Sequence, residues 1–102
     1  DVALEQSYLA ALRIAGAVCA TSPVVRKRKR LPSSAWDKLA LTGAEGKQWA
    51  ERFRRYSALR GRVASGIQRE IPAGRVMELL GQAERFYEFA QPDFGAGAPL
   101  VA

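Results

Sequence analysis

Residues 42–67 constrain the fold most, because their apolar side chains recur at the spacing of an amphipathic helix. At about 100° per residue, the apolar members fall within an arc of roughly 120° around Trp49: Phe53, Tyr56, Leu59, Val63 and Ile67. The opposite side is mostly basic and carries Lys47, Glu51, Arg54, Arg55 and Arg62. The spacing predicts one long helix with its apolar face in the core and its basic face in solvent.

Helical periodicity recurs in three other segments: residues 2–20, 34–41 and 73–90. Ser34 with Asp37 fits a capping box at one helix start, and Thr42 with Glu45 fits a second one at the start of the long helix. No stretch shows the alternation of apolar and polar residues that is typical of a strand. The sequence therefore predicts an all-α fold.

The expected architecture is an antiparallel up-and-down bundle of four helices, formed by a single domain over residues 1–91. A chain of 102 residues is long enough for one core. Residues 21–32 are expected to form a solvated loop, because Pro23 ends the first helix and the like charges that follow repel one another. Residues 92–102 are mostly Gly, Ala and Pro and are expected to form a flexible C-terminal tail.

The net charge of +6 is concentrated in five adjacent residues, which we call the basic segment: Arg26, Lys27, Arg28, Lys29 and Arg30. Outside the basic segment the chain has 11 basic and 10 acidic residues. A cationic segment neutralises phosphates and gains from counterion release, so this segment is the predicted nucleic-acid-binding element. It has no aromatic residue and would position a nucleic acid without reading bases by stacking. The alternative is a solvated loop that aids solubility.

Arginines of the long helix are further candidates. As a hypothesis, Arg54, Arg55 and Arg62 join the basic segment in one positive surface. Arg60 lies within the apolar arc instead, where a charge is costly unless it is paired. Its stem could pack while its head reaches water or a carboxylate. The other interpretation is that Arg60 lines a bundle cleft that holds a phosphate or a partner's carboxylate.

Two phenylalanines are candidate partner-binding residues. Phe89 falls on the outer face of the last helix, and Phe94 lies in the tail. These side chains could fold back onto the bundle or grip a partner protein.

The side chains that most enzymes and metal sites need are scarce. The chain has no histidine and one cysteine, which excludes an ordinary zinc site, the commonest general base and any intramolecular disulfide. We expect no catalytic residue, no metal site and no cofactor.

A single cysteine suits a reducing cytoplasm. No uninterrupted apolar run reaches the ~18 residues of a membrane span, so we expect a cytoplasmic protein without membrane contacts.

The order of several strings resembles a small actinobacterial family of the HEPN superfamily, named for higher eukaryotes and prokaryotes nucleotide-binding. The strings are YLAALRIAGAV from Tyr8, the basic segment, SAWD from Ser34, the long helix, and IPAGR from Ile71. The resemblance covers roughly residues 4–91 and implies a helical bundle that is often paired into dimers. Many HEPN proteins are metal-independent ribonucleases that use an arginine and a histidine with four to six residues between them. The positions that match after Arg60 hold Ser65, Gly66 and Ile67, so we do not expect nuclease activity.

Two functions follow from these observations. The first is a non-catalytic HEPN-like module that binds DNA or RNA through the basic segment. The second is a protein-interaction adaptor that uses the bundle and the tail, with the basic segment against an acidic protein surface. The resemblance implies a homodimer in either case.

Overall fold

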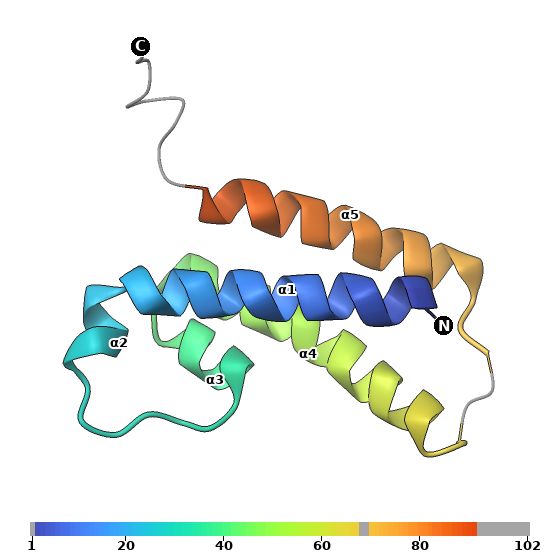
Figure 1. The fold of residues 1–102 in the computed structure, drawn as a ribbon, viewed down its shortest axis with the longest axis horizontal. Helices are drawn as coiled ribbons and strands as arrows, with labels where there is room; N and C mark the ends of the chain where they lie inside the picture. The colour runs from blue at the N-terminus through green and yellow to red at the C-terminus, as the bar shows by residue number, and fades with distance from the viewer. Residues whose placement is uncertain (1, 68–69, 92–102) are drawn as a thin grey trace, which may run out of the picture.

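The computed structural model describes residues 2–67 and 70–91, which form helices and connecting loops without a strand. The helices are α1 (Val2–Thr21), α2 (Pro23–Lys27), α3 (Ala35–Ala40), α4 (Ala44–Ala64) and α5 (Ala73–Ala90) (Figure 1). The all-α prediction is confirmed. The expected tail, including Phe94, lies outside the described residues.

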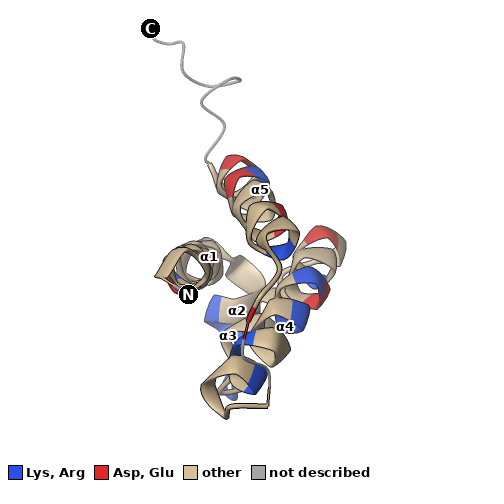
Figure 2. Cartoon of the chain, turned by 90° about the vertical axis from the view of Figure 1, so that its right-hand side faces the viewer, with Lys and Arg blue, Asp and Glu red and all other residues tan. Residues whose placement is uncertain are grey.

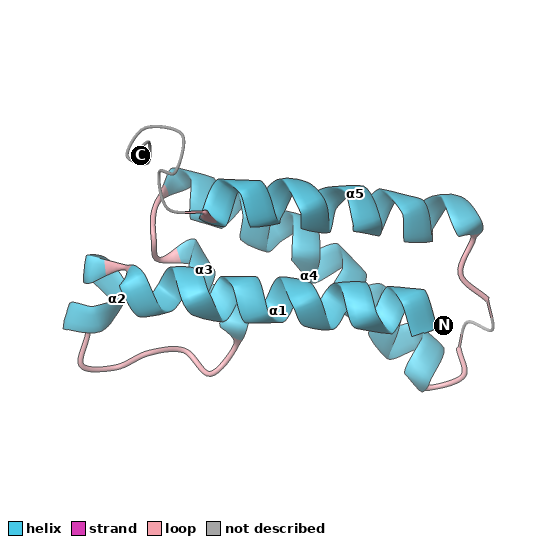
Figure 3. Ribbon diagram, turned by 45° about the horizontal axis from the view of Figure 1, so that its top comes forward, coloured by secondary structure: helices cyan, strands magenta, loops and turns pink. Residues whose placement is uncertain are grey.

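The three long helices alternate in direction along the chain, but they do not form the expected antiparallel bundle of four helices, in which the first and the last helix would run in opposite directions (Figures 1 and 3). α1 and α5 lie side by side and run the same way, and α4 runs in the opposite direction (Figures 1 and 3). The reason is the length of α3: six residues at about 1.5 Å per residue cover only about 9 Å, less than a third of α1. The chain therefore stays at the end where α1 finishes, and α4 starts from there.

Aromatic rings from α3, α4 and α5 form the centre of the core. Phe53 and Phe86 are fully buried, with ring centroids 5.0 Å apart. Trp36 stacks on Phe53 at 5.0 Å, and Trp49 lies 5.2 Å from Phe86. The predicted burial of the apolar face is thus confirmed for the middle of the long helix, from Trp49 to Leu59. Ile67 is 76% exposed, contrary to the prediction, because α4 ends at Ala64.

A buried hydrogen bond fixes α3 against α1. The indole Nε1 of Trp36 donates to the hydroxyl oxygen of Tyr8 at 2.8 Å, and both side chains are 4% exposed. At the start of α3, the Ser34 hydroxyl accepts from the backbone N–H of Asp37, as one half of the predicted capping box requires. The Asp37 carboxylate pairs with Arg54 of α4 instead. These contacts set the position of the short helix.

The joint between α3 and α4 differs from the prediction. Thr42 was expected to cap the long helix, but its hydroxyl donates to the carbonyl oxygen of Leu39 at 2.7 Å and so caps the end of α3. Gly43 occupies the N-cap position of α4 with φ at 147°, a conformation that favours glycine. Gly46 is buried against this joint, where its lack of a side chain lets Thr42 and Leu39 approach closely.

Part of the expected loop is helical. Pro23 ends α1 but also begins the one-turn helix α2, because proline is well suited to the first helical position. The hydroxyl of Ser22 accepts from the backbone N–H of Val25, and the Val25 side chain is buried. The prediction of a loop was wrong for residues 23–27. The start of the basic segment is therefore held on a helical turn.

By length and composition alone, α1 could cross a membrane. Its buried side chains pack into the bundle instead: Leu4, Ser7, Tyr8, Ala11, Ala15 and Cys19. A core helix that contacts neighbours on more than one side needs the same apolar character.

Candidate nucleic-acid interface

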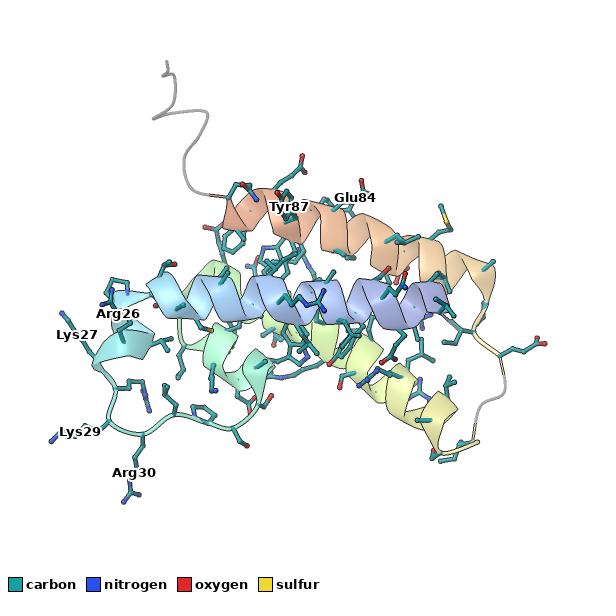
Figure 4. The ribbon with its side chains drawn as sticks, in the orientation of Figure 1. Arg26, Lys27, Lys29, Arg30, Glu84 and Tyr87 are labelled. Carbon is teal, nitrogen blue, oxygen red and sulfur yellow. The ribbon has the colours of Figure 1, made fainter. Side chains whose placement is uncertain are left out.

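The basic segment lies at the end of the molecule where α1 finishes. Arg26 and Lys27 are in the last turn of α2, and the remaining three residues continue into the loop toward α3. Lys27, Lys29 and Arg30 project away from the ribbon into solvent (Figure 4). The Arg28 Nε donates to the backbone carbonyl oxygen of Arg30 at 3.3 Å, which orders this part of the loop.

The five charges of the basic segment are not neutralised by any acidic side chain in the described part of the chain. Within residues 2–67 and 70–91, none of the five forms an ion pair with a carboxylate. Arg54, Arg60 and Arg75 of the described chain all have such partners. The segment therefore presents a local excess of positive charge to solvent, which an external anion would balance.

Beside the basic segment is a cavity of about 420 Å³, which we call the basic hollow. Its floor consists of small and apolar residues from the C-terminal half of α1, among them Ala15, Gly16 and Cys19. Three cations lie around it: Arg26 of α2, Arg28 of the loop and Lys38 of α3. None of the described residues that line the hollow is acidic. The arrangement combines an apolar surface with positive charge.

Cys19 is a buried thiol in this hollow. Burial raises its pKa above the ordinary value, and the Lys38 charge opposes that shift. A thiol that stays protonated at neutral pH is a poor nucleophile, in agreement with the packing role expected of a buried cysteine.

The predicted single positive surface is not formed, because the helix arginines lie in different places. Arg54 is engaged by Asp37. Arg62 lies in the last turn of α4, two residues after Arg60, whose partner Glu5 is near the start of α1. From Glu5 to the end of α1 is about 24 Å at about 1.5 Å per residue. The basic segment and Arg62 are therefore at opposite ends of the molecule.

Arg60 is held by an internal carboxylate. Its Nε lies 2.6 Å from one carboxylate oxygen of Glu5 and 2.9 Å from the other, and its guanidinium is 5.2 Å from the centre of the Tyr8 ring. The hydrogen bond from Arg60 lowers the pKa of Glu5, and the same bond raises the pKa of Arg60. The interpretation in which the head reaches a carboxylate is confirmed. A phosphate in the adjacent 560 Å³ hollow would have to compete with Glu5.

A second arginine cluster lies between α4 and α5, and it includes Arg55. Arg52, Arg55 and Arg75 line a small cavity of about 60 Å³ around the Tyr56 hydroxyl, which donates to Glu78. Burial, and then this hydrogen bond, raise the pKa of Tyr56 to about 12. Sequence reasoning missed Arg52 and Arg75 as members of a site. Arg52 and Tyr56 are four residues apart and so lie on one helix face, and this spacing could have indicated the cluster.

Phe89 does not face outward as predicted. It is partly buried and packs against Trp49 and Phe86, with ring centroids 6.0 and 6.1 Å away. The prediction that Phe89 is exposed on the outer face was wrong, because the last turn of α5 lies against the aromatic core. Any partner that contacts this region meets Tyr87, which is 56% exposed.

The largest cavity described lies between α1 and α5, with a volume of about 610 Å³. Ala10 and Ile14 of α1 face Leu80 of α5 across it, and its rim carries Glu84, Tyr87 and Glu88. Figure 2 shows acidic residues at the end of α5 nearer the C-terminus, and Figure 4 places Glu84 and Tyr87 across the molecule from Lys29 and Arg30. The cavity between α1 and α5 and the basic hollow thus carry opposite charge.

A family model of HEPN-like domains matches residues 3–91, which span the five described helices apart from Val2 at the start of α1. The chain belongs to this HEPN family. The predicted membership of the HEPN superfamily is confirmed, and the HEPN domain is a helical module of nucleotide-binding type. No curated protein and no solved structure matches the chain.

Among the described residues, no group of three or more metal-ligating side chains is close enough to hold an ion.

Proposed function

We propose that this HEPN domain is a non-catalytic module that binds nucleic acid through the basic segment. The observation that supports the proposal most is the local charge imbalance: five adjacent cations are exposed, and no described carboxylate pairs with them. Such an arrangement binds polyanions because each contacted phosphate releases condensed counterions. The chain has no histidine, so it lacks half of the arginine–histidine pair that HEPN nucleases use.

The surface that we propose for nucleic-acid binding differs from the one expected from the sequence. Lys38 of α3 joins the basic segment, because it lines the same hollow as Arg26 and Arg28. Arg54 contributes less because Asp37 balances its charge, and Arg62 is too far away to contact the same few phosphates. The proposed interface is therefore the end of the molecule formed by α2, the following loop and α3.

The test compares two variants that lose the same charge. One replaces Lys27, Lys29 and Arg30 with Gln in the basic segment. The control replaces Arg13, Lys47 and Arg85, which are also exposed, with Gln. Affinity for a fluorescent oligonucleotide is measured by anisotropy from about 50 to 200 mM salt.

We expect the segment variant to bind more weakly and to lower the slope of log affinity against log salt by about 2, since each lost contact to a single strand removes about 0.7. The control should keep the slope of the wild type. If both variants keep the affinity and the slope of the wild type, the basic segment does not bind nucleic acid. Turnover of RNA that a single arginine substitution abolishes would contradict the non-catalytic part of the proposal.

A second candidate function is a protein-interaction adaptor, and the groove between α1 and α5 favours it. The groove is apolar, open and rimmed by Tyr87 and two glutamates, as protein-docking sites often are. We propose the same groove as the contact of the expected homodimer. Light scattering of the wild type and of a Leu80→Glu variant tests the homodimer. Absence of nucleic-acid binding by the purified protein, together with a co-purifying partner, would favour the adaptor.

A further inference from the structure

We propose that the basic hollow receives one unstacked base of a single-stranded nucleic acid, so that the domain prefers single strands to duplex. This inference rests on the proposed function, in which the basic segment contacts the phosphates. It assigns a second role to the neighbouring cavity, which is recognition of a base rather than of the backbone.

The chemistry of the hollow fits a ligand that is apolar on one part and anionic on another. Ala15, Gly16 and Cys19 provide a floor without charge, and the cations at the cavity come from three different elements. The volume of about 420 Å³ lies within the range of about 300–1,000 Å³ that is typical of small-molecule sites. A nucleobase attached to its sugar phosphate has this division into a flat, weakly polar ring and a charged group.

The position of the two arginines connects the hollow with the basic segment. Arg26 and Arg28 belong to both, so a strand whose phosphates lie along the segment passes the mouth of the hollow. Lys38 approaches from α3 and adds positive charge from a separate element. A base that leaves the strand at this point exchanges contact with water for contact with the apolar floor, which is favourable.

Only a single strand can supply such a base at low cost. In a duplex the bases are paired and stacked inside, and the protein meets phosphates and groove edges. In a single strand the bases can turn outward onto a protein surface while the phosphates stay on basic side chains. The basic segment alone would not favour the single strand, because its contacts are electrostatic and a duplex has the higher charge density.

The other cavities fit this ligand less well. The arginine cluster around Tyr56 is small, and Glu78 already supplies an anion there. The groove between α1 and α5 is large enough, but Glu84 and Glu88 at its rim would repel phosphates. In the hollow beside Arg60, Glu5 balances the positive charge. Of the four cavities described above, the basic hollow alone therefore joins an apolar floor with unbalanced positive charge.

The test fills the hollow without changing charge. Gly16 is in α1, and a Cβ placed on it meets nothing within 4 Å, so Gly16→Leu puts a bulky side chain in open space at the hollow. Gly61→Leu is the matched control, because Gly61 is also helical, also meets nothing within 4 Å and lies at the other end of the molecule. Leucine favours helix over glycine at both positions, so both variants should fold.

We expect Gly16→Leu to weaken binding of a single-stranded oligonucleotide by about fivefold, the effect of leaving roughly 40 Å² of apolar surface unburied. Its affinity for a duplex of the same sequence should stay within twofold of the wild type. Gly61→Leu should leave both affinities unchanged.

Cys19 supplies an independent readout, because it is the chain's one cysteine and it lines the hollow. At alkaline pH, where more of the thiol is ionised, a single-stranded oligonucleotide should slow the reaction of Cys19 with a thiol reagent. Duplex and inorganic polyphosphate should protect it much less, since they occupy the basic segment without inserting a base.

The outcomes separate base recognition in the hollow from the proposed binding of nucleic acid by the basic segment. If Gly16→Leu binds single strands as the wild type does, or if polyphosphate protects Cys19 as well as an oligonucleotide does, base recognition in the hollow is overturned. The proposed function would still be tested separately. Its test is the salt dependence of binding by the variant in which Lys27, Lys29 and Arg30 are replaced with Gln. If the wild type binds no nucleic acid, both proposals fail.

Discussion

Gly46 should be the helical glycine that the fold cannot replace, although alanine is a better helix former. A Cβ at this position would lie 2.1 Å from the Thr42 hydroxyl oxygen and 2.5 Å from the backbone carbonyl oxygen of Leu39. Both distances are far below van der Waals contact. The carbonyl oxygen cannot rotate away, because it accepts hydrogen bonds from the backbone N–H and the hydroxyl of Thr42. Gly46→Ala therefore forces the joint between α3 and α4 to open.

The expected magnitude follows from two opposing effects. Overpacking of a closely packed site costs about 1–3 kcal/mol. Replacing glycine by alanine in a helix contributes at most about 1 kcal/mol in the other direction, and less in a first turn such as this one. Gly46→Ala should therefore lower the free energy of unfolding by about 1 kcal/mol or more. In a domain of this size that corresponds to a fall in Tm of about 4–8 °C.

Urea unfolding of matched variants measures the contact effect. Gly61→Ala shares the gain in helix propensity but meets nothing within 4 Å, so it should raise the free energy of unfolding. Thr42→Ala combined with Gly46→Ala removes the hydroxyl but leaves the carbonyl oxygen of Leu39, so it should recover only part of the loss. If Gly46→Ala is as stabilising as Gly61→Ala, the proposed close approach at the joint is refuted.

Three further predictions concern titratable and hydrogen-bonding side chains. Tyr8→Phe leaves the buried indole N–H of α3 without its acceptor and should cost about 1–3 kcal/mol of unfolding free energy; a cost within the error of a urea titration would contradict this. Because Arg60 lowers the pKa of Glu5, the pair stabilises the fold above the unfolded-state pKa of that carboxyl, and this contribution is lost as the pH falls through the lowered pKa. The difference in unfolding free energy between the wild type and Glu5→Gln should therefore shrink on acidification, and a difference independent of pH would refute the role of the pair. In ultraviolet difference titration against Tyr56→Phe, the Tyr56 phenol should ionise near 12, and ionisation near 10 would show that the hydroxyl is not buried as described.

Helical periodicity predicted the core because it needs only the angle of each side chain around one axis. Trp49, Phe53 and Tyr56 are buried as their spacing indicates. The same reasoning failed where an element ends or where two neighbours share its surface. Ile67 continues the apolar pattern, but α4 has already ended. Phe89 lies off the predicted stripe of α5, yet it packs against the aromatic core because that helix contacts both α1 and the rings of α4.

The candidate site was predictable in composition but not in shape. Five adjacent cations can be read directly from the sequence, and they indicate a polyanion partner without any knowledge of the fold. The basic hollow, by contrast, takes residues from α1, α2, a loop and α3, whose proximity no spacing reveals. The partners of Arg54 and Arg60 were equally hidden, since Asp37 and Glu5 are 17 and 55 residues away. Long-range pairing therefore decided which arginines remain available to a ligand.

The same packing that hides two arginines also makes the basic segment more than a charged loop. Ser22 and Pro23 start a helical turn, and buried Val25 anchors that turn to the end of α1, so the first cations have a fixed position. On the other side, the hydrogen bond between Trp36 and Tyr8 fixes α3 and with it Lys38. A purely flexible segment would bind polyanions of any shape with similar affinity. Cations held around a preformed apolar floor can instead distinguish ligands by what accompanies the phosphate, and for this reason we propose that the basic hollow receives a base.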